Sequence, residues 1–376
     1  MSADWPVAAP RAWRGFSSVG FVPFDADHPP PDVTVAAGER AGVRSQESGA
    51  SSGPTGAPWI DSNGWLIRLT RFRKPAAEVW VTTPPFKDNE VVPLESYLVA
   101  IADAAAFGGR WVLTPDPRLA RGVAGGAPEA LRDWERIAHA VRFFAARPAA
   151  GEEVRANLGI VSDFTGENET FARELLNLAE RRHAAYRLIG KASPGSAALG
   201  GLRAVLLADS QAPSPAWRKR LEDFAASGGL VIAGPKWGAP SGPPAPGEPL
   251  PRFDVRLHGR GRIAIGREMD DPFLVAADAQ VLISHRHDPI RLWNGGAWLA
   301  RVTGPPDGSR LTVQLVNYTG APPNNAVTIE VAGAFRSARL TTFEAGGPQT
   351  LRLLPRAGFV ELRLPPLGVY AAIELG

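Results

Sequence analysis

Three carboxylates, two after predicted strands and one in a polar segment, are candidates for acid–base chemistry. Asp61 follows a predicted strand at Trp59, Asp116 follows one at Trp111, and Glu47 lies in a polar segment. Two carboxyl groups that face each other can cleave a glycosidic bond, one as acid and the other as nucleophile or base. Asp61 fits a helix N-cap equally well, Asp116 fits a turn between two prolines better, and Glu47 fits a solvated loop. No pair stands out, so the three remain candidate catalytic residues.

Tryptophan is abundant in this chain, with 11 residues, and cysteine is absent. Apolar faces of sugar rings stack on aromatic side chains, although tryptophans equally suit large cores. The absence of cysteine excludes disulfides, thiolate metal sites and thiol nucleophiles. We expect no cofactor, and His285-Arg286-His287-Asp288 fits a surface turn better than a metal site. The candidate substrate-binding residues near the predicted strand ends are Trp59, Asn63, Trp80 and Trp111.

The elements that must position these residues alternate between strand and helix over residues 1–150. Strands are predicted at 78–83 and 110–114, each ending at proline. Helices are predicted at 65–72, 94–107 and 128–146 from apolar residues at helical spacing. In the last helix the residues expected to point inward are Leu131, Trp134, Ile137, Ala138 and Val141.

The stretch from Asn157 to Gly238 gives the clearest pattern. Short apolar strands alternate with helices that begin near Thr165 and Ser214, which predicts a doubly wound parallel sheet covered on both faces. Polar residues follow three of these strands, and ligands bind at such strand ends in open α/β sheets. These strand ends are Ser162-Asp163, Asp209-Ser210 and Lys236-Trp237.

Residues 238–251 are nearly all Gly, Pro, Ala and Ser, which indicates a linker between domains. Beyond it, short strands recur about every ten residues with Gly and Pro turns, a pattern typical of a β-sandwich. The predicted strands are 263–265, 281–284, 298–303, 311–318, 326–331, 337–343, 349–354, 359–364 and 369–374.

The middle stretch resembles the glutamine-amidotransferase-like domain, a flavodoxin-like sheet, of many glycosidases. In β-galactosidases of glycoside hydrolase family 42 this domain lies between a catalytic barrel and a C-terminal β-sandwich and mediates trimerisation. True amidotransferases attack with a cysteine on a sharp strand-to-helix turn, and this chain has none. We therefore expect a structural or interfacial domain without a strained nucleophile turn, and a homo-oligomer, by resemblance a trimer.

Residues 74–84 resemble the segment that leads into the seventh strand of the barrel in the same family. The resemblance implies a nucleophile glutamate at the end of that strand, where this chain has Thr82-Thr83. A full barrel needs about 200–250 residues, and the region before Pro58 is too short for the missing strands. Either the barrel is truncated or an unrelated small α/β layer resembles one. We favour a truncated barrel with reduced or lost activity.

Net charge is +3, and the arginines are dispersed among acids, which argues against a nucleic-acid partner. No apolar run approaches the roughly 18 residues of a membrane helix, and no signal peptide is recognised, so cytoplasmic localisation is the default. The sequence predicts an α/β plus all-β chain in three parts. These are a partial (β/α) barrel-like segment over 1–150, a flavodoxin-like domain over 151–238, and a β-sandwich over 252–376.

The function expected from these observations is that of a glycoside-hydrolase-like, carbohydrate-active protein that is truncated or catalytically degenerate. One alternative is a non-enzymatic protein that binds or assembles polysaccharide, which an open aromatic groove would favour. Another is an α/β domain that binds a small molecule at the three strand ends.

Overall fold

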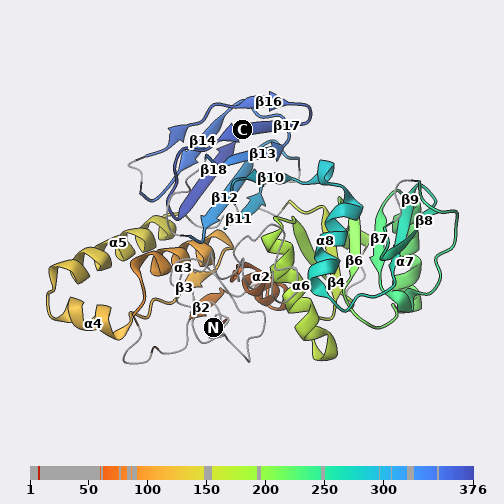
Figure 1. Cartoon of the computed structure of the whole chain (residues 1–376), viewed down its shortest axis with the longest axis horizontal. Helices are drawn as coiled ribbons and strands as arrows, with labels where there is room; N and C mark the ends of the chain where they lie inside the picture. Colours follow the sequence, from red (N-terminus) through yellow and green to blue (C-terminus); the bar gives the residue numbers. More distant parts are fainter. Residues whose placement is uncertain are drawn as a thin grey trace. The chain divides into compact units, whose positions relative to one another are not determined.

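The computed structural model describes residues 60, 62–75, 78–82, 86, 91–147, 155–192, 196–246, 250–295, 297–305, 307–319, 326–344 and 347–376, and the backbone of 7–8. Its contacts divide the chain into two compact units (Figure 1). The middle unit is Val154–Pro289, and the split unit combines Met1–Glu153 with Ile290–Gly376. Among the described residues, no helix combines the length and apolar character needed to cross a membrane.

A six-stranded sheet forms the centre of the middle unit, in the order β5-β4-β6-β7-β9-β8. All neighbours are parallel except the β8–β9 hairpin. The strands are β4 (Leu158–Ser162), β5 (Tyr186–Gly190), β6 (Ala204–Leu207), β7 (Leu230–Ala233), β8 (Phe253–His258) and β9 (Gly261–Gly266). The helices are α6 (Glu169–Arg181), α7 (Pro215–Ala226) and α8 (Pro272–Ile283), with short 3-10 turns η3 (Gly166–Asn168), η4 (Ser196–Leu199), η5 (Pro235–Trp237) and η6 (His285–His287).

Both faces of this sheet are buried, as the uniformly apolar strands predict. Val161 and Val231 share an apolar cluster with Leu221 of α7. The neighbouring Ile160 points to the opposite face, where it lines a small cavity of about 20 Å³ with Ala276 of α8. Successive residues of a strand alternate between faces, so one layer of helix covers each side. This confirms a mixed α/β unit with a parallel sheet.

Residues 253–283 differ from the prediction, which placed them with the β-sandwich. Strand 263–265 exists within β9, but it pairs with β7 in the six-stranded sheet. The predicted strand at 281–284 is wrong, because this run is the end of α8. Asp271 caps that helix by accepting N–H bonds from Phe273 (2.8 Å) and Leu274 (3.2 Å). A short apolar run has the same composition in a buried helix and in a strand, so periodicity alone does not separate them.

His183, just after α6, has the left-handed backbone conformation with φ 55°. Its Nδ1 is buried without a hydrogen-bond partner, and burial lowers the pKa of His183 from its ordinary 6.5 to about 4. The imidazole is therefore neutral in the folded chain at neutral pH.

We expect the middle unit to lose up to about 3 kcal/mol of stability as the pH falls from 6.5 to 4, because the unfolded histidine takes up a proton that the folded one rejects. The loss is absent above pH 6.5, where both forms are neutral. In His183→Asn, which tolerates the left-handed conformation, denaturation curves should lose this part of the pH dependence. Parallel pH profiles for the two proteins would contradict the assignment.

Two antiparallel sheets bury a shared apolar cluster in the split unit. The five-stranded sheet has the order β11-β12-β18-β14-β15 and the four-stranded sheet β10-β13-β17-β16. The strands are β10 (Ile290–Trp293), β11 (Trp298–Thr303), β12 (Leu311–Asn317), β13 (Thr328–Ala332), β14 (Ala338–Thr341), β15 (Gln349–Thr350), β16 (Leu354–Arg356), β17 (Phe359–Arg363) and β18 (Tyr370–Leu375). Seven of the nine predicted strands thus have counterparts here, and β10 was missed.

The rest of the split unit is a short parallel sheet with helices. Its strands are β1 (Val7–Ala8), β2 (Trp80–Thr82) and β3 (Arg110–Trp111), and its helices are α2 (Gly64–Arg73), α3 (Leu94–Ala106), α4 (Pro117–Ala124) and α5 (Pro128–Ala145). One apolar cluster joins this part to the five-stranded sheet. In β12, Leu315 faces the second sheet, whereas its neighbour Val316 faces that cluster. Both faces of the five-stranded sheet are therefore covered.

Helix α5 is present as predicted, but its inward face is narrower than expected. Ile137 is fully buried, whereas Leu131, Trp134 and Val141 are 43%, 37% and 42% exposed. Their predicted inward orientation is wrong, because Phe143 and Phe144, with Ala140, supply the contacts with the core instead. The short helix α4 was missed, because its eight residues include a glycine and a proline and too few apolar residues to show a helical period.

Candidate functional site

Three charged residues meet at the carboxyl end of the middle sheet because the register of three strands aligns them. Ser162 pairs with Gly190, and Val161 pairs with Leu207. Extending this register past the strand ends brings Asp163, Lys191 and Asp209 to one level. The winding reverses here, because β5 lies on one side of β4 and β6 on the other. Crevices at such a reversal are where open α/β sheets bind ligands.

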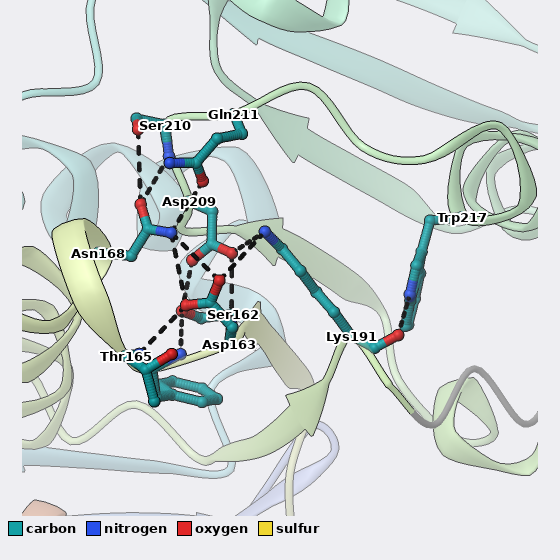
Figure 2. Close-up of polar contacts among 10 residues, drawn as sticks. Ser162, Asp163, Thr165, Asn168, Lys191, Asp209, Ser210, Gln211 and Trp217 are labelled. Carbon is teal, nitrogen blue, oxygen red and sulfur yellow. Dashed lines mark hydrogen bonds and ion pairs between the residues drawn. The ribbon is translucent and has the colours of Figure 1, made fainter.

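Asp209 is the buried centre of this strand-end cluster, which comprises Ser162, Asp163, Asn168, Lys191 and Asp209 (Figure 2). Its side chain is 2% exposed and forms an ion pair with the Lys191 ammonium, whose side chain is 31% exposed. The Ser162 hydroxyl donates to Asp209 Oδ1, and the Asp163 N–H donates to Oδ2 at 3.3 Å. A buried carboxylate is stable only when paired and hydrogen-bonded in this way.

Ser162 closes a sharp turn at the end of β4. Its hydroxyl accepts the N–H of Phe164 at 2.8 Å, and Phe164 has the left-handed conformation with φ 55°. The backbone of this turn is therefore strained at Phe164. Ser162 is fully buried, and its own hydrogen goes to Asp209 rather than to a histidine. A nucleophilic serine needs an exposed hydroxyl, and the Ser162 hydroxyl is buried.

Asn168 links the loop after β4 to the loop after β6. Its Nδ2 donates to Gln211 Oε1 at 2.8 Å, and its Oδ1 accepts the N–H of Ser210 at 3.2 Å. Within the first loop, Asp163 Oδ1 accepts the N–H of Thr165 at 3.1 Å. Figure 2 shows these bonds as one continuous network. The network ties the loop after β4 to the loop after β6.

Two charged groups of the cluster face outward. The side chain of Asp163 is 41% exposed, and its Oδ2 lies 3.8 Å from Lys191 Nζ. A carboxylate and an ammonium side by side can accept from and donate to a small polar molecule. Among the described residues, no group of three or more histidines and carboxylates could hold a metal ion.

The structure brings together two of the three strand ends that the sequence indicated. Ser162-Asp163 and Asp209-Ser210 lie in the cluster. Trp237 instead is 2% exposed, in the apolar core, and its carbonyl accepts a bond from Arg218 Nη1 at 2.7 Å. Lys191 was missed, although it directly follows an apolar strand and the same rule applies to it. Asn168 and Gln211 carry no such signal.

Asp116 caps helix α4. Its Oδ1 accepts the N–H groups of Arg118 (2.9 Å) and Leu119 (3.1 Å), and its Oδ2 accepts the Tyr97 hydroxyl at 2.8 Å. The residue is 1% exposed, and burial raises the pKa of Tyr97. These are the bonds of a helix cap, whereas the sequence analysis favoured a turn for Asp116. A catalytic role for Asp116 stays a prediction.

The other candidate residues of the split unit that the structure describes, Asn63, Trp80 and Trp111, do not form one surface. Asn63 is fully buried and donates its N–H and its Nδ2 to Asp103 Oδ2, both at 2.9 Å. Trp111 pairs with Val81 and therefore shares the inner face of the sheet, whereas Trp80, 42% exposed, points to the other face. Glu47, Trp59 and Asp61 lie outside the described residues.

Comparisons with known proteins give matches in structure but not in sequence. No family model and no curated protein matches the chain. An α-L-fucosidase, isoenzyme 2 from Paenibacillus thiaminolyticus, superposes with a TM-score of 0.56 at 12% identity, over 86% of this chain and 64% of that one. A β-galactosidase from Bacillus circulans gives 0.53 at 10%, over 84% and 58%.

A third match is a catalytic mutant of Gan42B, a GH42 β-galactosidase from G. stearothermophilus. It gives a TM-score of 0.52 at 12% identity, over 83% of this chain and 56% of that one. The chain therefore spans about three fifths of the length of these structures. At such identities the likeness concerns the fold, and it shows that this chain has a glycoside hydrolase-like fold.

Proposed function

We propose that this chain is a carbohydrate-active protein with a glycoside hydrolase-like architecture and little or no β-galactosidase activity of its own. The observation that carries the proposal is the likeness to three structures, each of a glycosidase or a glycosidase mutant. The likeness extends over more than four fifths of this chain in each case, so it includes both units. Function does not follow from fold alone, so the assay below decides it.

The finer interpretation of the parts supports this proposal. We take β1 to β3 with their helices as a partial (β/α) barrel, because parallel neighbours β2 and β3 are joined through helix α3. We take the six-stranded sheet as the amidotransferase-like, flavodoxin-like domain. The reasons are its strand order and the turn after β4, where the serine is buried. We take the two antiparallel sheets, which bury a shared apolar cluster, as the β-sandwich. Assembly into a homo-oligomer, by resemblance a trimer, stays a prediction.

The low expected activity follows from the residue at the end of β2. That strand ends at Thr82, where the family resemblance places a nucleophile carboxylate. A threonine hydroxyl does not form the glycosyl ester that a carboxylate forms in a retaining enzyme. The carboxylate that follows the neighbouring strand β3, Asp116, is occupied as a helix cap.

We expect the purified chain to show no turnover of aryl β-galactosides above background, and to retain binding to members of a polysaccharide panel. Asp61→Asn and Asp116→Asn are assayed beside it, and asparagine preserves the cap at position 116. Robust hydrolysis that either change abolishes would overturn the degenerate-enzyme proposal and assign that carboxylate. Hydrolysis that survives both changes would discard these two candidate residues.

A second candidate function is the binding of a small polar molecule by the middle unit. The observation in its favour is the register that brings Asp163 and Lys191 together at the reversal of winding. A chemical-shift survey with small polyols and amino acids tests it. Shifts confined to Asp163, Lys191 and their neighbours would support this function, and none at saturating ligand would exclude it.

A further inference from the structure

A cavity of about 140 Å³ lies between the start of α3 and the hairpin of α4 and α5 in the split unit. One water molecule needs about 10–15 Å³ by the same measure, so the space suits a molecule the size of a single sugar ring. Asp116 forms part of its wall directly after β3, the end at which (β/α) barrels place their sites. The cavity is separate from the strand-end cluster, which belongs to the other unit.

Apolar and charged residues both line this α4–α5 cavity. Val92 and Ala130 are among the apolar ones, and Arg118, Glu129 and Asp133 are charged, as is Asp116. A sugar ring likewise combines C–H groups on its faces with hydroxyls at its edge. Specific small-molecule sites typically combine an apolar wall with a few placed polar groups.

Three of the four charged groups of the wall are available to a ligand. Asp116 is held by α4 and Tyr97, so it fixes the wall rather than contacting a ligand. Glu129 and Asp133 are four residues apart on α5 and therefore neighbours on one helix face. Within the described part of the chain, neither carboxylate has a hydrogen bond or an ion pair, and the Arg118 side chain has none either.

The charge of the wall selects the ligand. Three carboxylates, Asp116, Glu129 and Asp133, face one guanidinium, Arg118. An anionic sugar is repelled by this excess of negative charge, whereas a protonated amine forms charge-assisted hydrogen bonds with free carboxylates.

We propose that the α4–α5 cavity binds an amino sugar, with its ammonium at Glu129 and Asp133 and its hydroxyls at Arg118. The inference rests on the proposed carbohydrate function and adds the class of sugar. It concerns binding and assigns no hydrolytic step to these residues.

Calorimetric titration of the full chain with glucosamine, glucose, N-acetylglucosamine and glucuronate tests the proposal at a pH where the amine is protonated. Glucosamine is expected to bind at least about tenfold more tightly than glucose or N-acetylglucosamine, the effect of one charge-assisted hydrogen bond. Glucuronate is expected not to bind. Equal binding of glucosamine and N-acetylglucosamine would overturn the proposal while leaving a carbohydrate function in place.

Variants locate the site. Asp133→Asn and Glu129→Gln should each weaken glucosamine binding about tenfold. Glu135→Gln is the matched control, because Glu135 is exposed on the same helix and does not line the cavity. Glucosamine affinity that is equal in all three variants would overturn the proposal. So would cyclohexylamine binding as tightly as glucosamine, since the sugar hydroxyls would then contribute nothing. Circular dichroism verifies the fold of each variant.

Discussion

Replacing Lys191 with methionine is expected to destabilise the middle unit by about 3 kcal/mol, because it leaves the buried Asp209 carboxylate without its cation. Asp209 keeps the bonds from Ser162 and from the Asp163 N–H, but these do not neutralise its charge. Urea denaturation followed by tryptophan fluorescence measures the change, and Trp217, which donates to the Lys191 carbonyl at 2.8 Å, lies next to the altered site.

Two further variants distinguish a lost ion pair from a general effect of removing a lysine. Lys219→Met breaks an exposed pair with Asp223 on α7, with side chains 78% and 67% exposed, and should cost less than about 0.5 kcal/mol. The double variant Lys191→Met with Asp209→Asn should recover most of the loss, because no uncompensated charge remains. A double variant as unstable as Lys191→Met alone would refute the charge argument.

Replacing Asp103 with alanine is expected to cost the split unit about 4 kcal/mol or more. Asp103 is fully buried in α3 and accepts the N–H and the side-chain amide of Asn63 as well as the Tyr318 hydroxyl. Alanine would leave three buried donors without an acceptor, and each costs about 1–3 kcal/mol. The shift of the midpoint of urea denaturation measures this loss of stability.

Asp103→Asn retains one acceptor oxygen and should lose clearly less stability than alanine. Asp307→Ala is the surface control in the same unit, because it removes an exposed turn bond to the Ser309 N–H at 2.9 Å. A cost for Asp103→Ala no larger than that of Asp307→Ala would mean that the buried network contributes little to the stability of this unit.

Much of the fold could be predicted because helix caps and apolar patterns in the sequence matched the helices and buried faces of the structure. Ser214 accepts the N–H of Trp217 as the cap of α7, and the alternation of residues 311–318 predicted the strand β12. The run 281–284 could not be assigned, since a short apolar run carries no period. Its membership in α8 depends on the cap at Asp271 and on packing against α6, which is a tertiary contact.

The candidate sites were less accessible to sequence reasoning. The strand-end rule found Asp163 and Asp209, because strand ends are visible as apolar runs followed by polar residues. It does not reach Asn168, which contacts Ser210 across 42 residues of sequence. The α4–α5 cavity depends on a helix that the sequence did not indicate, so neither Glu129 nor Asp133 could be selected in advance.

The split unit is interrupted in sequence by the whole of the middle unit, and this sets the order in which the chain can fold during synthesis. Residues 154–289 form their own unit and can fold as soon as they leave the ribosome. The first part of the split unit must wait for its partner, since Asp103 meets Tyr318 across 215 residues. While it waits, helix α3 exposes the apolar face that the sheet later covers. Synthesis speed and chaperone availability should therefore affect the folded yield of the full chain more than the folded yield of the middle unit expressed alone.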